Sequence, residues 1–296
     1  NVEGHDLTQT DGLTPGLADR WIVSQLQAAE AEVHRSFGDL RMDRAAQAIY
    51  EFIWHQYCDW YLELAKAVLN GDADEPTKAA TRRTLVAVLE AALRLAHPIM
   101  PFITEEIWQT VAPMVGKGGP SISQAPYPAP EAAKVDAEAD AAIEWLKGTV
   151  VAVRTVRGEM NIPPSKKLDV ILNAGNDSDR ELSATCDALV KRLAGIDQLS
   201  WLDGAEAPVA SMGVVGDMEV LVPMAGLIDA DAEIARLTKE ADRLRGDIKR
   251  TAGKLGNAGF VDKAPAAVVD KERAKLADAE ATLERLEAQI VKLNTL

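Results

Sequence analysis

Apolar residues near the end of the chain recur at alternating spacings of three and four, a pattern that restricts the fold more than any other feature of the sequence. Two such stripes are present, at Ile234, Leu237, Ala241, Leu244, Ile248, Thr251 and Leu255, and at Leu276, Ala279, Leu283, Leu286, Ile290 and Leu293. Side chains at this spacing form the seam between two supercoiled helices. A segment with Gly259 and Pro265 separates the stripes. Residues 229–296 are therefore predicted to form an antiparallel coiled-coil hairpin about 40 Å long, at about 1.5 Å per residue.

In such a hairpin, residues early in the first helix face residues late in the second. Ile234 is therefore expected near Ile290, and Ile248 near Leu276. A seam of this kind gives the hairpin a core of its own, so the rest of the chain is expected to fold without it.

Residues 1–164 are predicted to form a helical bundle. Apolar side chains at helical spacing indicate helices over about 14–37, 43–69, 76–96, 101–108 and 132–160. Thr14 is expected to cap the first of these helices, with Pro15 in its first turn. The tryptophans within these helices fall on the apolar stripes and are expected in the core: Trp21, Trp54, Trp60, Trp108 and Trp145.

The periodicity changes from helical to alternating at Leu168. Short runs of strand-forming residues occupy 168–172, 198–202, 208–215 and 218–223, with a helix over about 178–194 after the first run. Residues 165–228 are therefore predicted to form a small α+β connector with an antiparallel sheet. The fold class expected for the whole chain is mainly α, in three domains: 1–164, 165–228 and 229–296.

Composition and charge narrow the classes of protein to which the chain could belong. No apolar run of about 18 residues is present, so no membrane span is expected. The two cysteines, Cys58 and Cys186, lie far apart and argue against a disulfide framework, which fits a reducing cytoplasm. The net charge of −14 argues against indiscriminate nucleic-acid binding, although residues 229–296 are neutral, with 13 acidic and 13 basic residues. The chain begins at Asn1 without a leader and is expected to be part of a longer protein.

Four stretches of sequence carry a resemblance to a known family. They are Y-C-D-W-Y-L-E at 57–63, R-L-A-H-P-I-M-P-F-I-T-E-E-I-W at 94–108, L-V-P-M-A-G-L-I-D at 221–229 and K-L-G-N-A-G-F-V-D-K-A-P-A-A-V-V-D-K-E-R-A-K-L at 254–276. In these motifs the chain resembles class I aminoacyl-tRNA synthetases, and within that class the valyl family. The resemblance covers nearly the whole chain.

The resemblance implies that the chain is the tRNA-binding C-terminal part of such an enzyme. The bundle would recognise the anticodon region of valine tRNA, and the hairpin would hold the tRNA elbow, where the D- and T-loops meet. The N-terminal catalytic and editing domains of the same enzyme would attach valine for protein biosynthesis, using ATP with Mg²⁺. The enzyme would be a cytoplasmic monomer that does not bind membranes.

The chain itself lacks the motifs of a catalytic site. The class I signatures H-I-G-H and K-M-S-K-S are absent, as are a P-loop and a G-x-G-x-x-G motif after a strand. The four histidines, His5, His34, His55 and His97, do not have the spacing of metal ligands. We therefore expect no catalytic residue, metal or cofactor in this chain, and any contact with tRNA must come from local basic clusters.

The first candidate for contact with the anticodon region consists of Arg154, Arg157, Asn161, Lys166 and Lys167. Arg154 and Arg157 are three residues apart and share a helix face. The pattern R-x-x-R-x-x-M-N-I-P-P-x-K resembles the helix end of the valyl family's anticodon domain, and guanidinium groups suit phosphates and base edges. The alternative is a solvated helix face whose basic residues complement the helix dipole.

The second candidate for the same contact consists of Arg82, Arg83 and Arg94. Arg83 and Arg94 share a helix face, because they lie about three turns apart. The alternative is ion pairing with Glu90 or its neighbours, which is common on the polar face of a bundle.

The third candidate is the loop end of the hairpin, with Arg243, Arg245, Lys249, Arg250, Lys254, Phe260 and Lys263. Basic residues that flank an aromatic ring suit an RNA loop, because unpaired bases stack on rings while phosphates bind cations. By resemblance, this end would contact the tRNA elbow. The alternatives are ordinary ion pairs along a coiled coil and, for Phe260, a plug between the two helices.

Two other functions are compatible with the sequence. The same region of an isoleucyl, leucyl or methionyl enzyme would contain a similar bundle, although the motif at 57–63 and the hairpin favour the valyl family. A coiled-coil module that binds another protein is favoured by the acidic net charge and disfavoured by the local basic clusters. A salt titration of tRNA binding separates RNA binding from protein binding, because phosphate contacts make log affinity fall with log salt.

Overall fold

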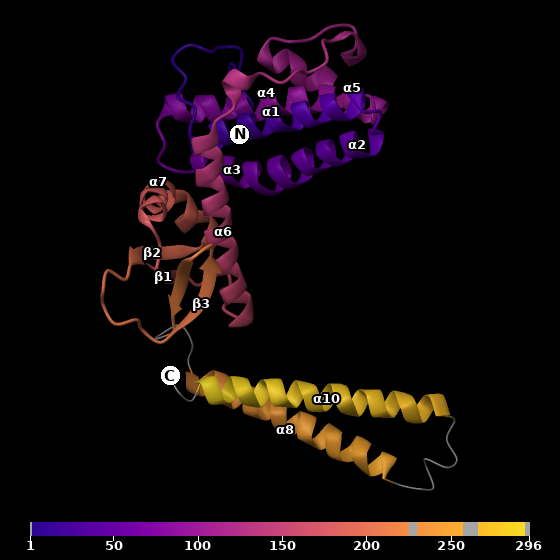
Figure 1. Ribbon diagram of the computed structural model, residues 1–296, viewed down its shortest axis with the longest axis vertical. Helices are drawn as coiled ribbons and strands as arrows, with labels where there is room; N and C mark the ends of the chain where they lie inside the picture. Colours follow the sequence, from indigo (N-terminus) through magenta and orange to yellow (C-terminus); the bar gives the residue numbers. More distant parts are fainter. Residues whose placement is uncertain (1, 225–229, 257–265, 294–296) are drawn as a thin grey trace. The chain divides into compact units, whose positions relative to one another are not determined.

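The computed structural model of the protein describes residues 2–224, 230–256 and 266–293 (Figure 1). Within these ranges the chain is mainly helical, and its strands all lie between Leu168 and Pro223. This confirms the predicted fold class. The chain divides into two compact units, residues 1–203 with 212–220, and residues 204–211 with 221–296. The division into three domains stays a prediction.

The bundle consists of long helices joined by short connections. Its helices are α1 (Leu17–Gly38), α2 (Met42–Tyr50), α3 (Leu62–Leu69), α4 (Glu75–Ala96), α5 (Pro101–Val111) and α6 (Ala137–Glu159). A π-helical segment, Glu51–Tyr61, joins α2 to α3 without a break. Three short 3-10 turns lie between α5 and α6, at Ala112–Val115, Ile122–Gln124 and Ala132–Lys134.

The start of α1 differs from the prediction that Thr14 caps it. The helix begins at Leu17, and its N-cap is Gly16 in an extended conformation. The Asp19 carboxylate accepts a hydrogen bond from the Gly16 N–H at 3.1 Å, so a side chain within the first turn satisfies this donor. The Thr14 N–H instead donates to the Pro76 carbonyl at 3.4 Å, which holds the lead-in against the start of α4.

The core of the bundle forms where α1 packs on α4, α6 and the π-helical segment. Its largest fully buried side chains include Trp21, Ile22, Tyr61, Leu64, Leu95, Ile143 and Leu146. Asp19 is buried among them, and its carboxylate accepts hydrogen bonds from the Tyr61 hydroxyl at 2.6 Å and the Thr81 hydroxyl at 2.8 Å. Burial raises the pKa of Asp19 against the effect of these hydrogen bonds. The polar contacts therefore stabilise a carboxyl group that connects three helical segments.

The π-helical segment explains why one tryptophan expected in the core lies on the surface. Hydrogen bonds from residue i to i+5 widen each turn, so the buried side chains of Phe52 and Tyr57 are five positions apart. Trp54 falls outside this buried face: it is 54% exposed and stacks on Tyr50, with ring centroids 6.2 Å apart. The prediction for Trp54 is therefore wrong. The structure buries Trp21, Trp108 and Trp145 and half-buries Trp60.

The sheet contains a parallel pair of strands, so the predicted antiparallel arrangement is wrong there. β1 (Leu168–Asn173) pairs in parallel with β2 (Ile196–Trp201), and α7 (Asp177–Ala194) connects them. A helix between two strands returns the chain to the end where the first strand began, so the second strand runs in the same direction. β3 (Ala210–Val215) and β4 (Met218–Pro223) complete a sheet of order β2-β1-β4-β3.

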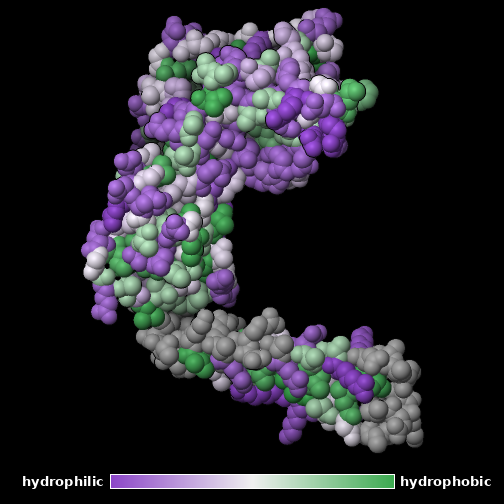
Figure 2. Space-filling view, in the orientation of Figure 1, coloured by the Kyte–Doolittle hydropathy of each residue, from purple (hydrophilic) through white to green (hydrophobic). Residues whose placement is uncertain are grey.

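The long helix α6 connects the bundle to the strands, because it packs both on α1 and on α7 (Figure 1). At Gly148 of α6, an added Cβ would lie 2.8 Å from the Val215 side chain. A glycine at this position therefore allows β3 to approach the helix closely. The surface around these elements mixes hydrophilic and apolar residues (Figure 2). Its exposed apolar side chains include Val151 of α6 and Met212 and Val214 of β3.

The hairpin is formed by α8 (Ala230–Leu255) and α10 (Ala266–Leu293), which pack against each other. Its seam includes the buried side chains Ala241, Thr251 and Val269. Val269 lies one heptad before Leu276, so the second apolar stripe begins earlier than predicted.

Ion pairs across the hairpin show the direction of its helices. Arg245 lies 2.6 Å from Glu287, and Lys254 lies 4.0 Å from Glu272. The earlier residue of α8 therefore faces the later residue of α10, in agreement with an antiparallel order. The side chains of Ile234 and Ile290 lie outside the described residues, and the contact between Ile248 and Leu276 stays a prediction.

Candidate nucleic-acid interface

A hollow with basic residues on its wall lies where α6 and α7 end. It has a volume of about 540 Å³, and its wall includes Arg154, Arg157, Asn161 and Arg192. The structure thus brings three of the predicted RNA-binding residues to one surface. Arg192, an exposed residue in the last turn of α7, was missed by the sequence analysis. The sequence feature that could have indicated Arg192 is the pair of basic residues in the last turn of α7, before Gly195. This end of α7 reaches the hollow because α7 packs on α6.

Arg157 is buried, unlike the solvent-facing arginine that the sequence suggested. Its guanidinium donates hydrogen bonds to four backbone carbonyls, those of Pro163, Lys166, Ala194 and Gly195, at 2.7 to 3.2 Å. Burial lowers the pKa of Arg157. The side chain therefore ties the end of α6 to the chain before β1 and to the end of α7, and it shapes the hollow from within.

The remaining residues of this cluster are more accessible. Arg154 donates one hydrogen bond, to the Leu193 carbonyl at 3.0 Å, and is otherwise exposed. Asn161 is exposed and lies in the turn after α6, where its backbone has a positive φ of 51°. Lys167 is exposed, whereas Lys166 is half-buried. Arg154, Asn161, Lys167 and Arg192 are thus the polar groups here that an RNA strand could reach.

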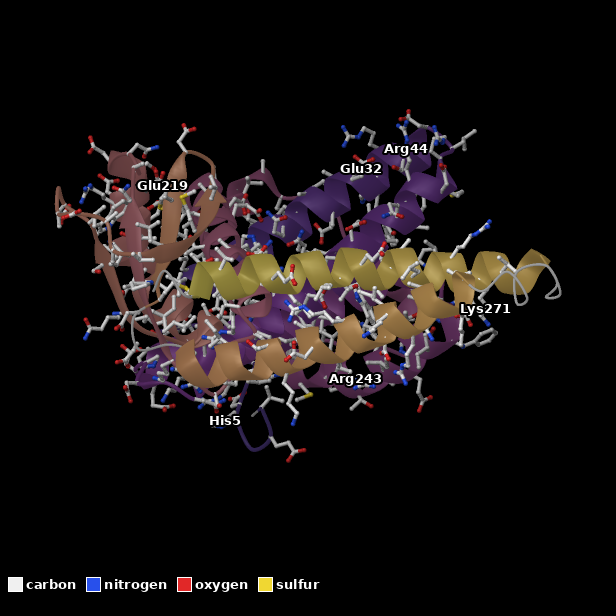
Figure 3. The ribbon with its side chains drawn as sticks, turned by 90° about the horizontal axis from the view of Figure 1, so that it is seen from below. His5, Glu32, Arg44, Glu219, Arg243 and Lys271 are labelled. Carbon is white, nitrogen blue, oxygen red and sulfur yellow. The ribbon has the colours of Figure 1, made fainter. Side chains whose placement is uncertain are left out.

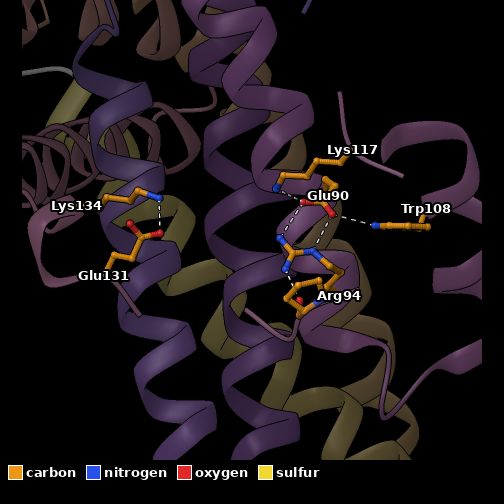
Figure 4. A network of polar contacts seen from close by, with 7 residues as sticks. Glu90, Arg94, Trp108, Lys117, Glu131 and Lys134 are labelled. Atoms are coloured by element: carbon orange, nitrogen blue, oxygen red, sulfur yellow. Dashed lines mark hydrogen bonds and ion pairs between the residues drawn. The ribbon is translucent and has the colours of Figure 1, made fainter. Parts of the chain in front are cut away.

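In the second basic cluster, Arg94 lies against a fully buried carboxylate, Glu90 (Figure 4). Arg94 donates to both oxygens of Glu90 at 2.7 and 2.9 Å, Lys117 lies 2.6 Å away, and the Trp108 ring N–H donates at 2.9 Å. Burial alone would raise the pKa of Glu90, but the hydrogen bonds from these three residues hold it below its ordinary value. Arg94 therefore has the ion-pair role that the sequence analysis weighed as the alternative.

The other two arginines of this cluster, Arg82 and Arg83, differ in their partners. Arg82 forms an ion pair with Glu75 at 3.3 Å, and the Glu75 side chain is 75% exposed. Arg83 is half-buried, and its Nε is buried without a hydrogen-bond partner within the described residues. The three arginines thus do not form one exposed RNA-binding face.

The third basic cluster lies on the hairpin, and several of its members form ion pairs. Arg245 pairs with Asp242 and Glu287, and Arg250 pairs with Asp247. These contacts are the coiled-coil ion pairs that the sequence analysis weighed as the alternative.

Other cations of the hairpin are exposed. Arg243 of α8 and Lys271 of α10 project from the two helices (Figure 3), and Lys249 is also exposed. The distance between Lys254 and Glu272 is long for an ion pair, at 4.0 Å. Phe260 and Lys263 lie outside the described residues.

The described residues do not suggest a metal centre or a membrane span. In the ranges that the structure covers, no three His, Cys, Asp or Glu side chains are placed to hold a metal ion. No helix there has the length and apolar character needed to cross a membrane. The three basic clusters instead offer hydrogen-bond donors and positive charges to a ligand.

Comparisons with known proteins match the two main parts of the chain separately. Residues 19–172 match the family model of the anticodon-binding domain of tRNA ligase, and residues 229–294 match that of the valyl tRNA synthetase tRNA binding arm. A valine–tRNA ligase of Acinetobacter baylyi is 50% identical over 283 residues, which cover 94% of this chain and 29% of that relative. The chain therefore spans less than a third of the length of this curated relative.

Proposed function

Because this chain belongs to the valyl-tRNA synthetase family, of which it carries the anticodon-binding domain and the tRNA-binding arm, we propose that it binds valine tRNA for a valine–tRNA ligase. The bundle recognises the anticodon region, and the hairpin of α8 and α10 holds the elbow. Catalytic and editing domains outside this chain attach valine to the tRNA with ATP and Mg²⁺. The enzyme works as a monomer in the cytoplasm.

The observation that carries this proposal is the match of two tRNA-binding families to two separate parts of the chain. One match covers the bundle as far as β1, and the other covers the helical hairpin. Two binding surfaces on one protein increase the affinity for one long ligand, because the second contact forms within the complex. Exposed cations on each part, such as Arg154 and Lys249, suit the phosphates of such a ligand.

Binding of the chain to valine tRNA and to the same tRNA with an exchanged anticodon tests the proposal. Over a series of salt concentrations, log affinity is expected to fall linearly with log salt for both RNAs, because phosphate contacts release counterions. The exchanged tRNA is expected to bind more weakly at every salt concentration. Equal affinities would contradict anticodon recognition, and binding that salt does not weaken would favour the alternative of a protein partner.

A further inference from the structure

A cavity of about 610 Å³ lies between α1, α4 and the chain that follows α5. Part of its wall is apolar, with Val23 and Leu26 from α1 and Ala87 and Ala91 from α4. Small organic ligands bind in protein pockets of roughly 300–1,000 Å³. The space is therefore sufficient for a single nucleobase.

Glu30 lines this cavity with a carboxyl group that lacks a hydrogen-bond partner. The residue is 4% exposed, and within the described ranges its carboxyl group has neither a hydrogen bond nor an ion pair. Buried carboxyl groups are ordinarily satisfied, because their desolvation is otherwise uncompensated. Because Glu30 lines the cavity, a ligand there can donate a hydrogen bond to its carboxyl group.

Burial, more than the neighbouring charges, sets the pKa of Glu30. Burial raises the pKa of Glu30 to about 7, even though Arg94 of α4 and then Lys134 lower it. Glu131 raises it and His34, on the same helix, lowers it. Other charged or titratable groups on the cavity wall are Arg83, Lys117 and Tyr127.

Arg83 on this wall has a buried nitrogen without a hydrogen-bond partner among the described residues. Its Nε is buried without a hydrogen-bond partner, and no ion pair joins its guanidinium to Glu30 or to another residue of the described chain. The other cations of the wall are already paired: Arg94 and Lys117 with Glu90, and Lys134 with Glu131 (Figure 4). Glu30 and Arg83 thus remain for a ligand.

The two groups define the chemistry of that ligand. It must donate to the Glu30 carboxylate and accept from the Arg83 guanidinium. A nucleobase with an exocyclic amino group does both, because glutamate accepts from such an amine and arginine binds ring, carbonyl or phosphate acceptors. The wall carries four cations (Arg83, Arg94, Lys117 and Lys134) against two carboxylates (Glu30 and Glu131). With Glu90, which pairs with two of these cations, one positive charge remains in excess, and this favours RNA over a cationic protein side chain.

We propose that this cavity holds one unpaired base of the bound tRNA, with its exocyclic amino group on Glu30 and an acceptor of the same nucleotide on Arg83. Unpaired loop bases are the part of an RNA that proteins read by stacking and hydrogen bonding. The inference rests on the proposed function of tRNA binding and assigns a base-reading site to it.

The test uses the whole chain, valine tRNA, and tRNAs in which single loop bases with amino groups are replaced by uracil, which lacks that group. The unaltered protein is expected to lose about tenfold in affinity at one loop position. Glu30→Gln is expected to bind the natural tRNA about tenfold more weakly and to be indifferent to the replacement at that position. The preference of the unaltered protein for the amino-bearing base should weaken as pH falls below about 7, because Glu30 becomes protonated.

Glu131→Gln is the matched control, because Glu131 lies on the same wall but pairs with Lys134. It should retain both affinity and base preference, and Arg83→Gln should show the same tenfold loss as Glu30→Gln. Thermal melting of each variant confirms that it is folded. If the unaltered chain binds tRNA while Glu30→Gln keeps its affinity, base preference and pH profile, the inference is overturned and the proposed function stands. If the unaltered chain does not bind tRNA at all, the proposed function fails first.

Discussion

At the scale of single residues, Glu90 illustrates how the bundle tolerates a buried charge. Its carboxylate is fully buried and is satisfied by Arg94, Trp108 and Lys117. Arg94→Ala is expected to lower the free energy of unfolding by about 3–5 kcal/mol, because it leaves that charge without its strongest partner. Arg82→Ala, which removes an ion pair to the exposed Glu75, is expected to lower it by less than about 1 kcal/mol. Urea unfolding of both variants measures the difference.

The pH dependence of stability provides a check on Glu90. Its folded pKa lies below the ordinary value of 4.5, so its contribution to stability is present above that pH and disappears as pH falls through the folded value. Arg94→Ala should reduce this dependence. Equal destabilisation by Arg94→Ala and Arg82→Ala would contradict the role assigned to Glu90.

Glu30 has the opposite effect on stability. Its folded pKa of about 7 lies above the ordinary value of 4.5, so ionisation destabilises the folded protein as pH rises between these values. Glu30→Gln is therefore expected to be more stable than the unaltered protein at pH 8, by up to about 3 kcal/mol, and to have no advantage at pH 4. Melting temperatures at the two pH values measure this. A variant that is destabilised at pH 8 would show that the Glu30 carboxylate has a partner in the folded chain.

Arg154 and Arg192 are the exposed arginines of the hollow at the ends of α6 and α7. Arg154→Ala and Arg192→Ala are each expected to weaken binding to valine tRNA by about 1–3 kcal/mol, with little change in stability. Lys191→Ala is the matched control, because Lys191 is adjacent in sequence but forms an ion pair with Asp187 at 2.9 Å. Filter binding at constant salt compares the three. An equal effect of all three substitutions would point to net charge rather than to this hollow.

At the scale of secondary-structure elements, Arg157 joins the end of α6 to the sheet module. Its four hydrogen bonds reach carbonyls before β1 and at the end of α7. Arg157→Ala is expected to lower the free energy of unfolding by at least about 2 kcal/mol, because buried carbonyls lose their donor. Arg157→Lys should restore little of it, since one ammonium group lacks the planar fork of a guanidinium. Hydrogen exchange of β1 and α7 should rise in both variants, and unchanged stability with weakened tRNA binding would make Arg157 a direct RNA contact.

At the scale of the whole molecule, the hairpin and the bundle are expected to contribute separately to tRNA binding. Deletion of residues 229–296 should leave the bundle folded, because α8 and α10 have their own seam with Ala241 and Val269 buried in it. Affinity should fall by the same factor for valine tRNA and for the anticodon-exchanged tRNA. The slope of log affinity against log salt should shrink by about one for each phosphate that the hairpin neutralises in the complex. If affinity and slope are unchanged, the hairpin binds something other than RNA.

Much of this architecture could be predicted from the sequence, because its determinants are local. Helical spacing marks the elements of the bundle, and the alternating spacings of three and four indicate the hairpin of α8 and α10. A helix of known position between two strands could also have indicated a parallel pair, but alternation alone does not show strand direction. The arginines at 154 and 157 were found by their shared helix face, which is likewise a local property.

The features that the sequence did not predict depend on contacts between segments that are far apart in the chain. The π-helical turn that exposes Trp54 and the burial of Arg157 beneath four carbonyls follow from contacts that a one-dimensional pattern does not contain. The same holds for the contacts of Glu90 with Trp108 and Lys117, whereas its pairing with Arg94 four residues later is local and was weighed from the sequence. Distant contacts likewise decide the surroundings of Glu30 and Arg83, which are ordinary charged residues of two helices in the sequence. Only the packing of α1, α4 and the chain after α5 places both on one cavity wall and buries the Arg83 Nε without a hydrogen-bond partner among the described residues, because burial and partners are properties of the surroundings rather than of the residue.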